Sequence, residues 1–284
     1  MKRLRIIIAA LICASTLPLL AQEESIPVYE TTDNDFQFRA GWAITKNLSR
    51  KVNVEWSEEF RIRDTFGAFD RMYSEIGVEY TVLDWLKLQG RYTHMLINHK
   101  GKNKTEGKSY WENRHRGTLG VTFYYKTYYN WRFSLRELAQ VTFLDNSVHG
   151  YKLYDKGEKA NPKWVLKSRF KAEYAFRHIP FTPYAYIEVA NTLNAPNAYE
   201  ITGYNEDGSQ IRKKHAGNDY IEKVRTAIGC EYRFDRRNSI DVYYRFDYEF
   251  NKDINIGANS GMLKDITEET SCINIIGVNY KFKF

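Results

Sequence analysis

Residues 271–284 read SCINIIGVNYKFKF, and from Ile276 onward they alternate strictly between two kinds of side chain. The even positions are apolar or aromatic, and the odd positions between them hold glycine, asparagine or lysine. A period of two predicts a β-strand with one apolar face and one polar face. The same pattern recurs along the chain, so this strand sets the expectation for the whole fold.

Ten further segments show the alternation, which brings the total to eleven. They are 36–45, 52–63, 72–82, 86–98, 114–125, 131–144, 164–177, 183–193, 220–234 and 240–251. Two places depart from the pattern. Glu58 breaks the parity of its segment, and Glu137 with Leu138 disturbs another. We expect a β-bulge or a register shift at both.

The connections between these segments alternate in length. Short turns are expected near 47–50, 83–86, 126–130, 177–182 and 235–239, and longer polar loops near 64–70, 98–112, 145–162, 194–218 and 251–270. Short turns at one rim and long loops at the other are expected of an outer-membrane barrel. The sequence therefore predicts an all-β fold, an antiparallel up-and-down transmembrane β-barrel over residues 34–284.

Eleven segments would give an odd number of strands, whereas bacterial single-chain barrels use an even number, so one more strand is expected. The stretch from Ser25 to Thr31 alternates briefly and predicts a short first strand within residues 22–33. We therefore expect about 12 strands, in a range of about 10 to 12, since one pair could sit outside the closed wall.

The aromatic end of the chain points to the same class of protein. Last strands of Gram-negative outer-membrane barrels end in this way and are read by the barrel-insertion machinery. The positions of the predicted insertion signal are Val278, Tyr280, Phe282 and Phe284. With Phe284 at the periplasmic rim, the long loops face outward.

Residues 1–21 predict a secretory signal peptide, with basic residues at positions 2, 3 and 5 and an apolar run over 6–20. The cleavage site is imperfect because Leu19 occupies the −3 position. Cys13 leaves a lipoprotein leader as an alternative. Beyond residue 22 no stretch approaches the roughly 20 apolar residues that a membrane helix needs.

The bulk composition fits a barrel without requiring one. The chain is 15% aromatic, yet its mean hydropathy is −0.58, as expected of strands that are apolar only at alternate positions. A soluble periplasmic β-barrel binding protein would have a similar composition and remains an alternative.

The formal charge of +7 falls to +4 (7 − 3) without the leader, which is too small to indicate a nucleic-acid partner. Cys230 and Cys272 fall on apolar positions, which favours free thiols over a disulfide.

The polar parity of the strands predicts a charged barrel lumen. Both signs occur in comparable numbers, so we expect either a packed ladder of Arg–carboxylate pairs or a narrow polar pore or ligand site. The predicted lumen-facing residues are Glu55, Glu59, Arg61, Arg63, Glu75, Glu79, Arg91, Arg132, Arg136, Lys167, Arg169, Glu173, Glu188, Arg225, Glu231, Arg233, Asp241, Arg245, Asp247 and Glu249.

Catalytic and cofactor motifs are not found in the sequence. No serine lies on the same strand at a useful spacing from any histidine, and cross-strand partners cannot be read from sequence. His94 and His115 flank one long loop, which leaves a lipid-modifying enzyme at the barrel rim as an alternative. No metal-ligand or nucleotide-binding spacing occurs, so we expect no enzymatic activity and no cofactor.

These features together resemble a known group of proteins. The paired strands, the R-x-R at Arg61 and Arg63, the strand of Glu188 after Pro183, and the aromatic end are similar to the uncharacterised barrel family called domain of unknown function 2490, of the Bacteroidetes type. The resemblance implies an outer-membrane barrel, with outer-membrane lipid and the insertion machinery as partners. It implies no activity and no catalytic residue.

Overall fold

The computed structural model describes residues 28–63, 68–99, 110–145, 162–194, 198–204, 210–215, 220–256 and 263–284. The predicted signal peptide, 1–21, lies outside the described residues, as do residues 22–27. Within the described ranges the regular structure is all β, and no helix there is long and apolar enough to cross a membrane. The strands are β1 (Val28–Asn47), β2 (Val52–Arg63), β3 (Ala68–Leu83), β4 (Leu86–His99), β5 (Tyr110–Lys126), β6 (Trp131–Phe143), β7 (Lys163–Tyr174), β8 (Phe181–Thr192), β9 (Ala198–Tyr204), β10 (Gln210–His215), β11 (Tyr220–Arg233), β12 (Asn238–Ile256) and β13 (Leu263–Lys283).

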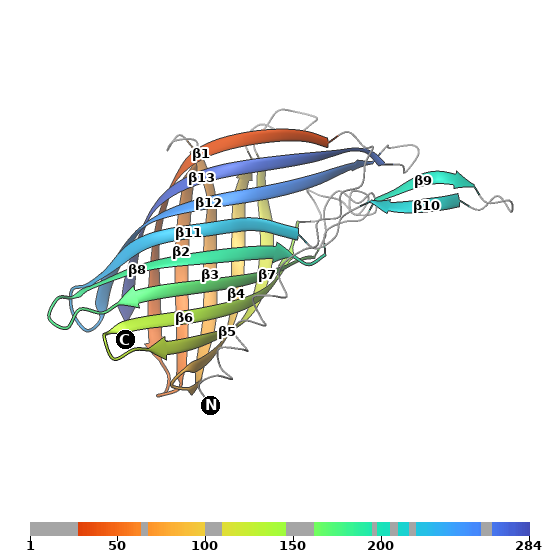
Figure 1. The fold of residues 1–284 in the computed structure, drawn as a ribbon. Helices are drawn as coiled ribbons and strands as arrows, with labels where there is room; N and C mark the ends of the chain where they lie inside the picture. Colours follow the sequence, from red (N-terminus) through yellow and green to blue (C-terminus); the bar gives the residue numbers. More distant parts are fainter. Residues whose placement is uncertain are drawn as a thin grey trace.

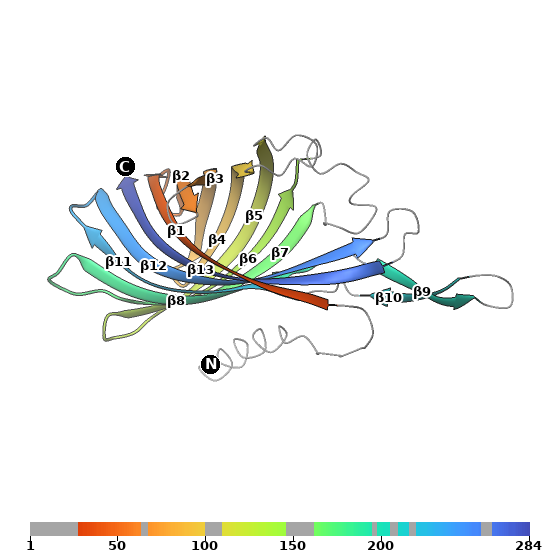
Figure 2. The ribbon, with the colours of Figure 1, turned by 90° about the horizontal axis from the view of Figure 1, so that it is seen from above.

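Eleven of these strands close into one barrel, in the order β1-β13-β12-β11-β8-β7-β6-β5-β4-β3-β2 (Figure 1). The pair β9 and β10 forms a separate two-stranded sheet, which projects beyond the barrel in Figure 2. Chain neighbours in the wall pair antiparallel, as an up-and-down barrel requires. The predicted fold class is confirmed, with a strand number inside the expected range.

The closing seam differs from the prediction of an even number. β1 and β13 pair in parallel, from Val28↔Ile266 to Thr45↔Lys283. With eleven strands alternating in direction, the first and last run the same way, so only a parallel pair can close the wall. The expected extra strand within residues 22–33 is not separate in its described part: residues 28–31 are the start of β1.

Two predicted loops also contain strands. The stretch 194–218 includes β9 and β10, and the stretch 251–270 lies largely in β12 and β13, which pair as far as Ile256↔Leu263. None of these segments holds a long run of alternating apolar residues, so the pattern did not indicate them as strands. The five predicted tight turns are present and mark one end of the barrel. We call this end the turn rim, and the opposite end the loop rim.

Alternation separates an apolar outer wall from a polar interior. Large side chains such as Trp56, Ile76, Leu119 and Ile228 are 50%, 53%, 71% and 62% exposed and point outward. Aromatic contacts ring the wall near both rims: Phe69 packs on Trp111 toward the loop rim, and Trp85 stacks on Phe123 at the turn rim. The polar residues between these positions point inward.

The predicted bulges at Glu58 and Glu137 are wrong. The register is continuous at both positions, and the shifts lie elsewhere, for example between Arg61 and Ile62. Each glutamate instead points outward with its apolar neighbours and accepts a hydrogen bond from a serine on the next strand. Cys230 and Cys272 are free, as predicted.

Candidate functional site

The centre of the interior is a cluster of arginines around Glu188 of β8. Arg225 of β11 donates through Nη1 to Glu188 Oε1 at 2.5 Å, and Arg169 of β7 donates through Nε to Oε2 at 2.6 Å. Arg136 of β6 reaches the same Oε2 from 3.6 Å. Glu188 is only 2% exposed, so this carboxylate is buried among three guanidinium groups from three strands.

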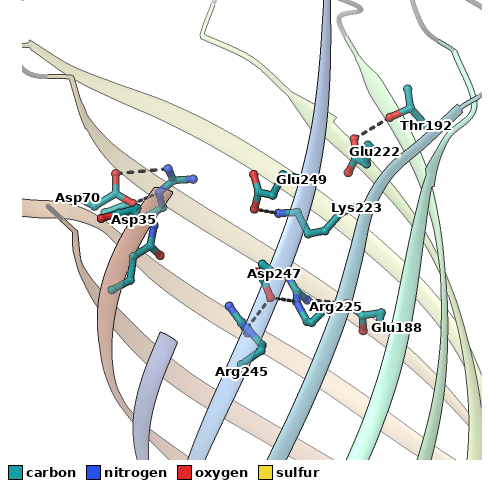
Figure 3. A network of polar contacts seen from close by, with 12 residues as sticks. Asp35, Asp70, Glu188, Thr192, Glu222, Lys223, Arg225, Arg245, Asp247 and Glu249 are labelled. Carbon is teal, nitrogen blue, oxygen red and sulfur yellow. Dashed lines mark hydrogen bonds and ion pairs between the residues drawn. The ribbon is translucent and has the colours of Figure 1, made fainter. Parts of the chain in front are cut away.

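Arg225 extends the cluster to Asp247 of β12. Its Nε lies 2.9 Å from Asp247 Oδ1 and its Nη2 lies 3.2 Å from Oδ2. Arg245, two residues earlier on β12, places its own Nε 2.9 Å from Asp247 Oδ1. Figure 3 shows Asp247 between the two arginines, with Glu188 on the far side of Arg225. A chain of alternating charges thus runs across neighbouring strands, and each buried carboxylate is paired as burial demands.

A second group comes from β1 and β2. Arg61 Nε lies 2.5 Å from Glu59 Oε1, while Arg39 Nη1 lies 3.8 Å from the same oxygen. Arg39 also donates through Nη2 to Gln37 Oε1 at 3.1 Å. Register sets this group beside the first one: Arg39 is paired with Gly277, which in turn is paired with Tyr243 of β12. Because Gly277 has no side chain, the Tyr243 ring occupies the space beside it.

Smaller ion-pair groups line the interior toward both rims. On the turn-rim side, Arg91 lies 2.5 Å from Glu75 and 3.0 Å from Glu55, and Lys281 lies 2.8 Å from Glu231. Further pairs are Lys87–Glu79, Arg132–Glu173, Lys171–Glu173 and Lys281–Asp241, and, toward the loop rim, Lys223–Glu249, Lys163–Glu222 and Arg63–Asp70. Charge pairing therefore runs along the height of the barrel.

The structure places the residues predicted for the lumen as follows. Those in interior ion pairs are Glu55, Glu59, Arg61, Arg63, Glu75, Glu79, Arg91, Arg132, Arg136, Arg169, Glu173, Glu188, Arg225, Glu231, Asp241, Arg245, Asp247 and Glu249. Lys167 lies on the same interior face of β7 as Arg169. Arg233 differs, because its side chain is 64% exposed at the turn rim.

Several interior residues were missed by sequence reasoning. Arg39 lies at a polar position of its alternating segment, so the rule used for the other strands also predicts that it faces the lumen. Asp70 and Glu112, 1% and 0% exposed, fall in stretches predicted as loops. Lys223 and Lys281 also follow the polar parity and complete ion pairs with predicted residues. The missed basic residues change the charge balance of the interior.

The central belt carries more cations than anions. Arg136, Arg169, Arg225 and Arg245 surround Glu188 and Asp247, and Arg39 and Arg61 share Glu59, which makes six guanidinium groups to three carboxylates. Arg39 and Arg245 are 3% and 7% exposed. Nε and Nη1 of Arg39, and Nε and Nη2 of Arg245, lack hydrogen-bond partners among the described residues. For Nε of Arg245, the 2.9 Å approach to Asp247 is an ion pair without hydrogen-bond alignment.

Residues 40–256 match the family described as Protein of unknown function (DUF2490). The chain belongs to this family. The matched range runs from residue 40, within β1, to the end of β12, and the resemblance drawn from the sequence is confirmed. The family is described as of unknown function, so membership in DUF2490 assigns no activity to the charged interior.

Other comparisons give distant likenesses only. The siderophore receptor PirA from Acinetobacter baumannii shares 10% identity with this DUF2490 chain at a TM-score of 0.29, over 81% of this chain and 46% of the receptor. PirA from Pseudomonas aeruginosa gives 10% identity and a TM-score of 0.24, over 79% and 48% of the two chains. The chain thus spans about half the length of these receptors. No curated protein matches it.

Proposed function

We propose that this protein is an outer-membrane β-barrel whose interior is a narrow conduit for small anions. The observation that carries the proposal is the cationic surplus of the central belt, where Arg39 and Arg245 hold buried guanidinium nitrogens that find no hydrogen-bond partner in the described part of the chain. A buried donor that lacks a partner is costly, and a passing anion would supply the missing acceptor.

The outward apolar wall supports the membrane location. Closure of the barrel leaves no unpaired strand edge in the wall, which a lipid environment requires. Alternate outward positions carry large apolar side chains, and aromatic residues gather near both rims, as expected of a barrel in a bilayer.

The size of the barrel supports a narrow passage. Eleven strands spaced about 4.8 Å apart and tilted by about 40° give a backbone diameter of roughly 20 Å. Arginine and glutamate side chains from opposite walls fill much of that width. The interior therefore suits small hydrated ions, and large solutes are excluded.

Conductance of the reconstituted barrel tests the proposal. The full-length protein would be inserted into planar bilayers under a KCl gradient. We expect a small conductance whose reversal potential is shifted toward the equilibrium potential of chloride. The variant R39Q/R245Q should lose much of the anion preference, whereas R233Q should keep it because Arg233 is exposed at the turn rim. Absence of conductance across salts and voltages, or a preference for cations, would reject the conduit.

Cell fractionation tests the location separately. We expect the protein in the outer-membrane fraction, where a folded barrel migrates differently in gels before and after heating. Recovery in the soluble periplasm would favour the alternative of a soluble β-barrel binding protein.

A further inference from the structure

Next to Trp42 of β1, the outer wall carries a row of four polar side chains at a level where most outward neighbours are apolar. Register runs Trp42↔Glu58↔Ser74↔His94↔His115 across β1 to β5, without a shift at any of these pairs. All five positions share the outward parity of Trp56, Ile76 and Tyr92, which are about half exposed. Polar groups on a lipid-facing wall are costly and mark function more often than packing.

Hydrogen bonds join Ser74 to Glu58 and His94 to Asn113, and the strand register places the two pairs side by side. Ser74 Oγ donates to Glu58 Oε2 at 2.8 Å, and on its other side Ser74 is paired in register with His94 of β4. His94 Nε2 lies 3.1 Å from Asn113 Oδ1. When Nε2–H donates to that amide oxygen, Nδ1 of His94 keeps its lone pair and can accept a proton.

The next histidine completes the surroundings of Ser74. The His115 ring lies 5.2 Å from the His94 ring, and its Nδ1 is 2.7 Å from the Tyr92 hydroxyl. With the tyrosine O–H donating to Nδ1, His115 keeps Nε2–H as a free donor. A nucleophile, a base, a group that orients the base, and a donor for a developing oxyanion then lie on one outward patch.

We propose that this patch, formed by Ser74, His94, Asn113 and His115, cleaves carboxylic-ester bonds of membrane lipids. The proposal departs from the expectation of no enzymatic activity. It goes beyond the conduit, and it rests only on the membrane location. The sequence left a lipid-modifying enzyme at His94 and His115 as an alternative but indicated no serine, because the pairing of Ser74 with His94 is a matter of register.

The height of the patch fits an acyl ester. His94 lies eight residues from Leu86 at the turn rim, and eight residues at about 3.3 Å each with a tilt of about 40° climb about 20 Å. The apolar band of such barrels is about 25 Å tall. The patch therefore lies near the upper boundary of the band, where the ester carbonyls of lipids are found, and about 10 Å below the contact of Phe69 with Trp111.

The reaction balances with water as the only co-reactant. Rotation about χ1 of Ser74 moves the hydroxyl from Glu58 to His94. Ser74 Oγ adds to the ester carbonyl carbon while its proton passes to His94 Nδ1, and the ester C–O bond then breaks as His94 returns that proton to the departing alcohol. Water cleaves the acyl-Ser74 ester by the same two proton transfers, which releases a fatty acid and restores Ser74.

A matched control residue exists on another part of the outer wall. Ser168 of β7 also points outward and donates to a glutamate, Glu137 Oε2, at 2.5 Å. Its other cross-strand partner is Val189, so it has the carboxylate of the Ser74 arrangement without the histidine. A reaction that needs only an outward Ser–Glu pair would use both serines, and a reaction that needs His94 would use Ser74 alone.

The test uses the full-length protein refolded into diacyl phosphatidylethanolamine vesicles, with folding checked by heat-modifiable migration. We expect an alkyl fluorophosphonate to form an adduct on Ser74, mapped by peptide mass spectrometry, and fatty acid to be released from diacyl lipid but not from ether-linked lipid. S74A should abolish both signals, H94Q should slow release by roughly 100-fold, and S168A should change neither.

Four results would overturn the proposal: no Ser74 adduct, an adduct without release of fatty acid, release that survives S74A, or equal labelling of Ser74 and Ser168. Conductance does not enter any of these readouts. Failure of the lipid site and failure of the conduit can therefore be told apart.

Discussion

Arg225 and Glu188 form a short ion pair at the centre of the barrel, with Nη1 of the arginine 2.5 Å from Oε1 of the glutamate. The same arginine also holds Asp247. Its removal should leave two buried carboxylates short of a cation, and R225M should destabilise the barrel by about 3 kcal/mol or more. Urea unfolding in lipid vesicles, followed by tryptophan fluorescence, measures this loss. R233M is the control, since an exposed arginine 3.9 Å from Glu231 should contribute less than about 0.5 kcal/mol. Equal losses in the two variants would mean that the central network adds no stability.

The parallel seam can be tested by cross-linking. Ala40 of β1 is paired with Val278 of β13. In a C230S/C272S background, A40C/V278C should therefore form a disulfide that changes the mobility of the unreduced protein, because adjacent strands bring Cα atoms within the range of a disulfide. A40C/V242C should not cross-link, since β13 separates Val242 from β1. Cross-linking of the control pair, or of neither pair, would contradict the observed closure.

Gly277 makes room for a buried ring. A Cβ at Gly277 would collide with the Tyr243 ring, which is only 8% exposed. G277A should therefore destabilise the barrel by about 1 to 3 kcal/mol, and adding Y243S should recover part of that loss. At Gly90 the nearest atom to an added Cβ is 3.8 Å away, so G90A should be neutral or slightly stabilising. The three unfolding curves can be compared directly, and similar losses for G277A and G90A would argue against a steric cause.

The turn between β11 and β12 should respond to acid. Asp235 lies outside the strands, and its carboxylate accepts hydrogen bonds from the Asn238 side chain at 2.7 Å and from the backbone N–H groups of Arg237 and Asn238 at 2.6 and 2.8 Å. These hydrogen bonds hold the pKa of Asp235 below its ordinary value. The folded turn thus favours the ionised form, so the stabilisation is present above the unfolded pKa of about 3.9 and is lost as the pH falls through the lower folded value.

Amide signals of Arg237 and Asn238 followed by NMR should titrate with a midpoint below about 3.9. The D235N variant, which has no group to titrate, should show no such transition. A midpoint at or above the ordinary value would mean that the hydrogen bonds do not favour the carboxylate.

The sequence predicted most strands of the barrel wall, because alternation of large apolar residues such as Ile76 and Val78 is the direct pattern of a two-faced strand. The same parity identified interior residues such as Glu188 and Arg225. The parity rule failed at positions where a polar residue occupies an outward site. Glu58 and Glu137 were interpreted as bulges because each breaks the alternation of its segment, and only the register revealed the serines that hydrogen-bond them.

Other features could not be read from a single strand at all. The outer parts of β12 and β13 hold too few apolar residues in alternation to indicate a strand, and only their pairing with each other identifies them. The approach of Ser74 to His94 depends on which residues of β3 and β4 face each other. The cationic surplus at Arg39 and Arg245 depends on how β1 and β12 pair with the two edges of β13. These are properties of pairing, and pairing is set by the whole sheet.

The parallel seam also has a consequence for how the barrel is assembled. Each antiparallel neighbour pair joined by a tight turn can zip from that turn, but β1 and β13 lie at opposite ends of the chain and share no turn. Their contact closes a loop of more than 200 residues, so its entropic cost is met only after the other strands have paired. The seam should then be the last part of the wall to form and the first to open. Slow folding steps and the earliest backbone hydrogen exchange should both fall on β1 and β13.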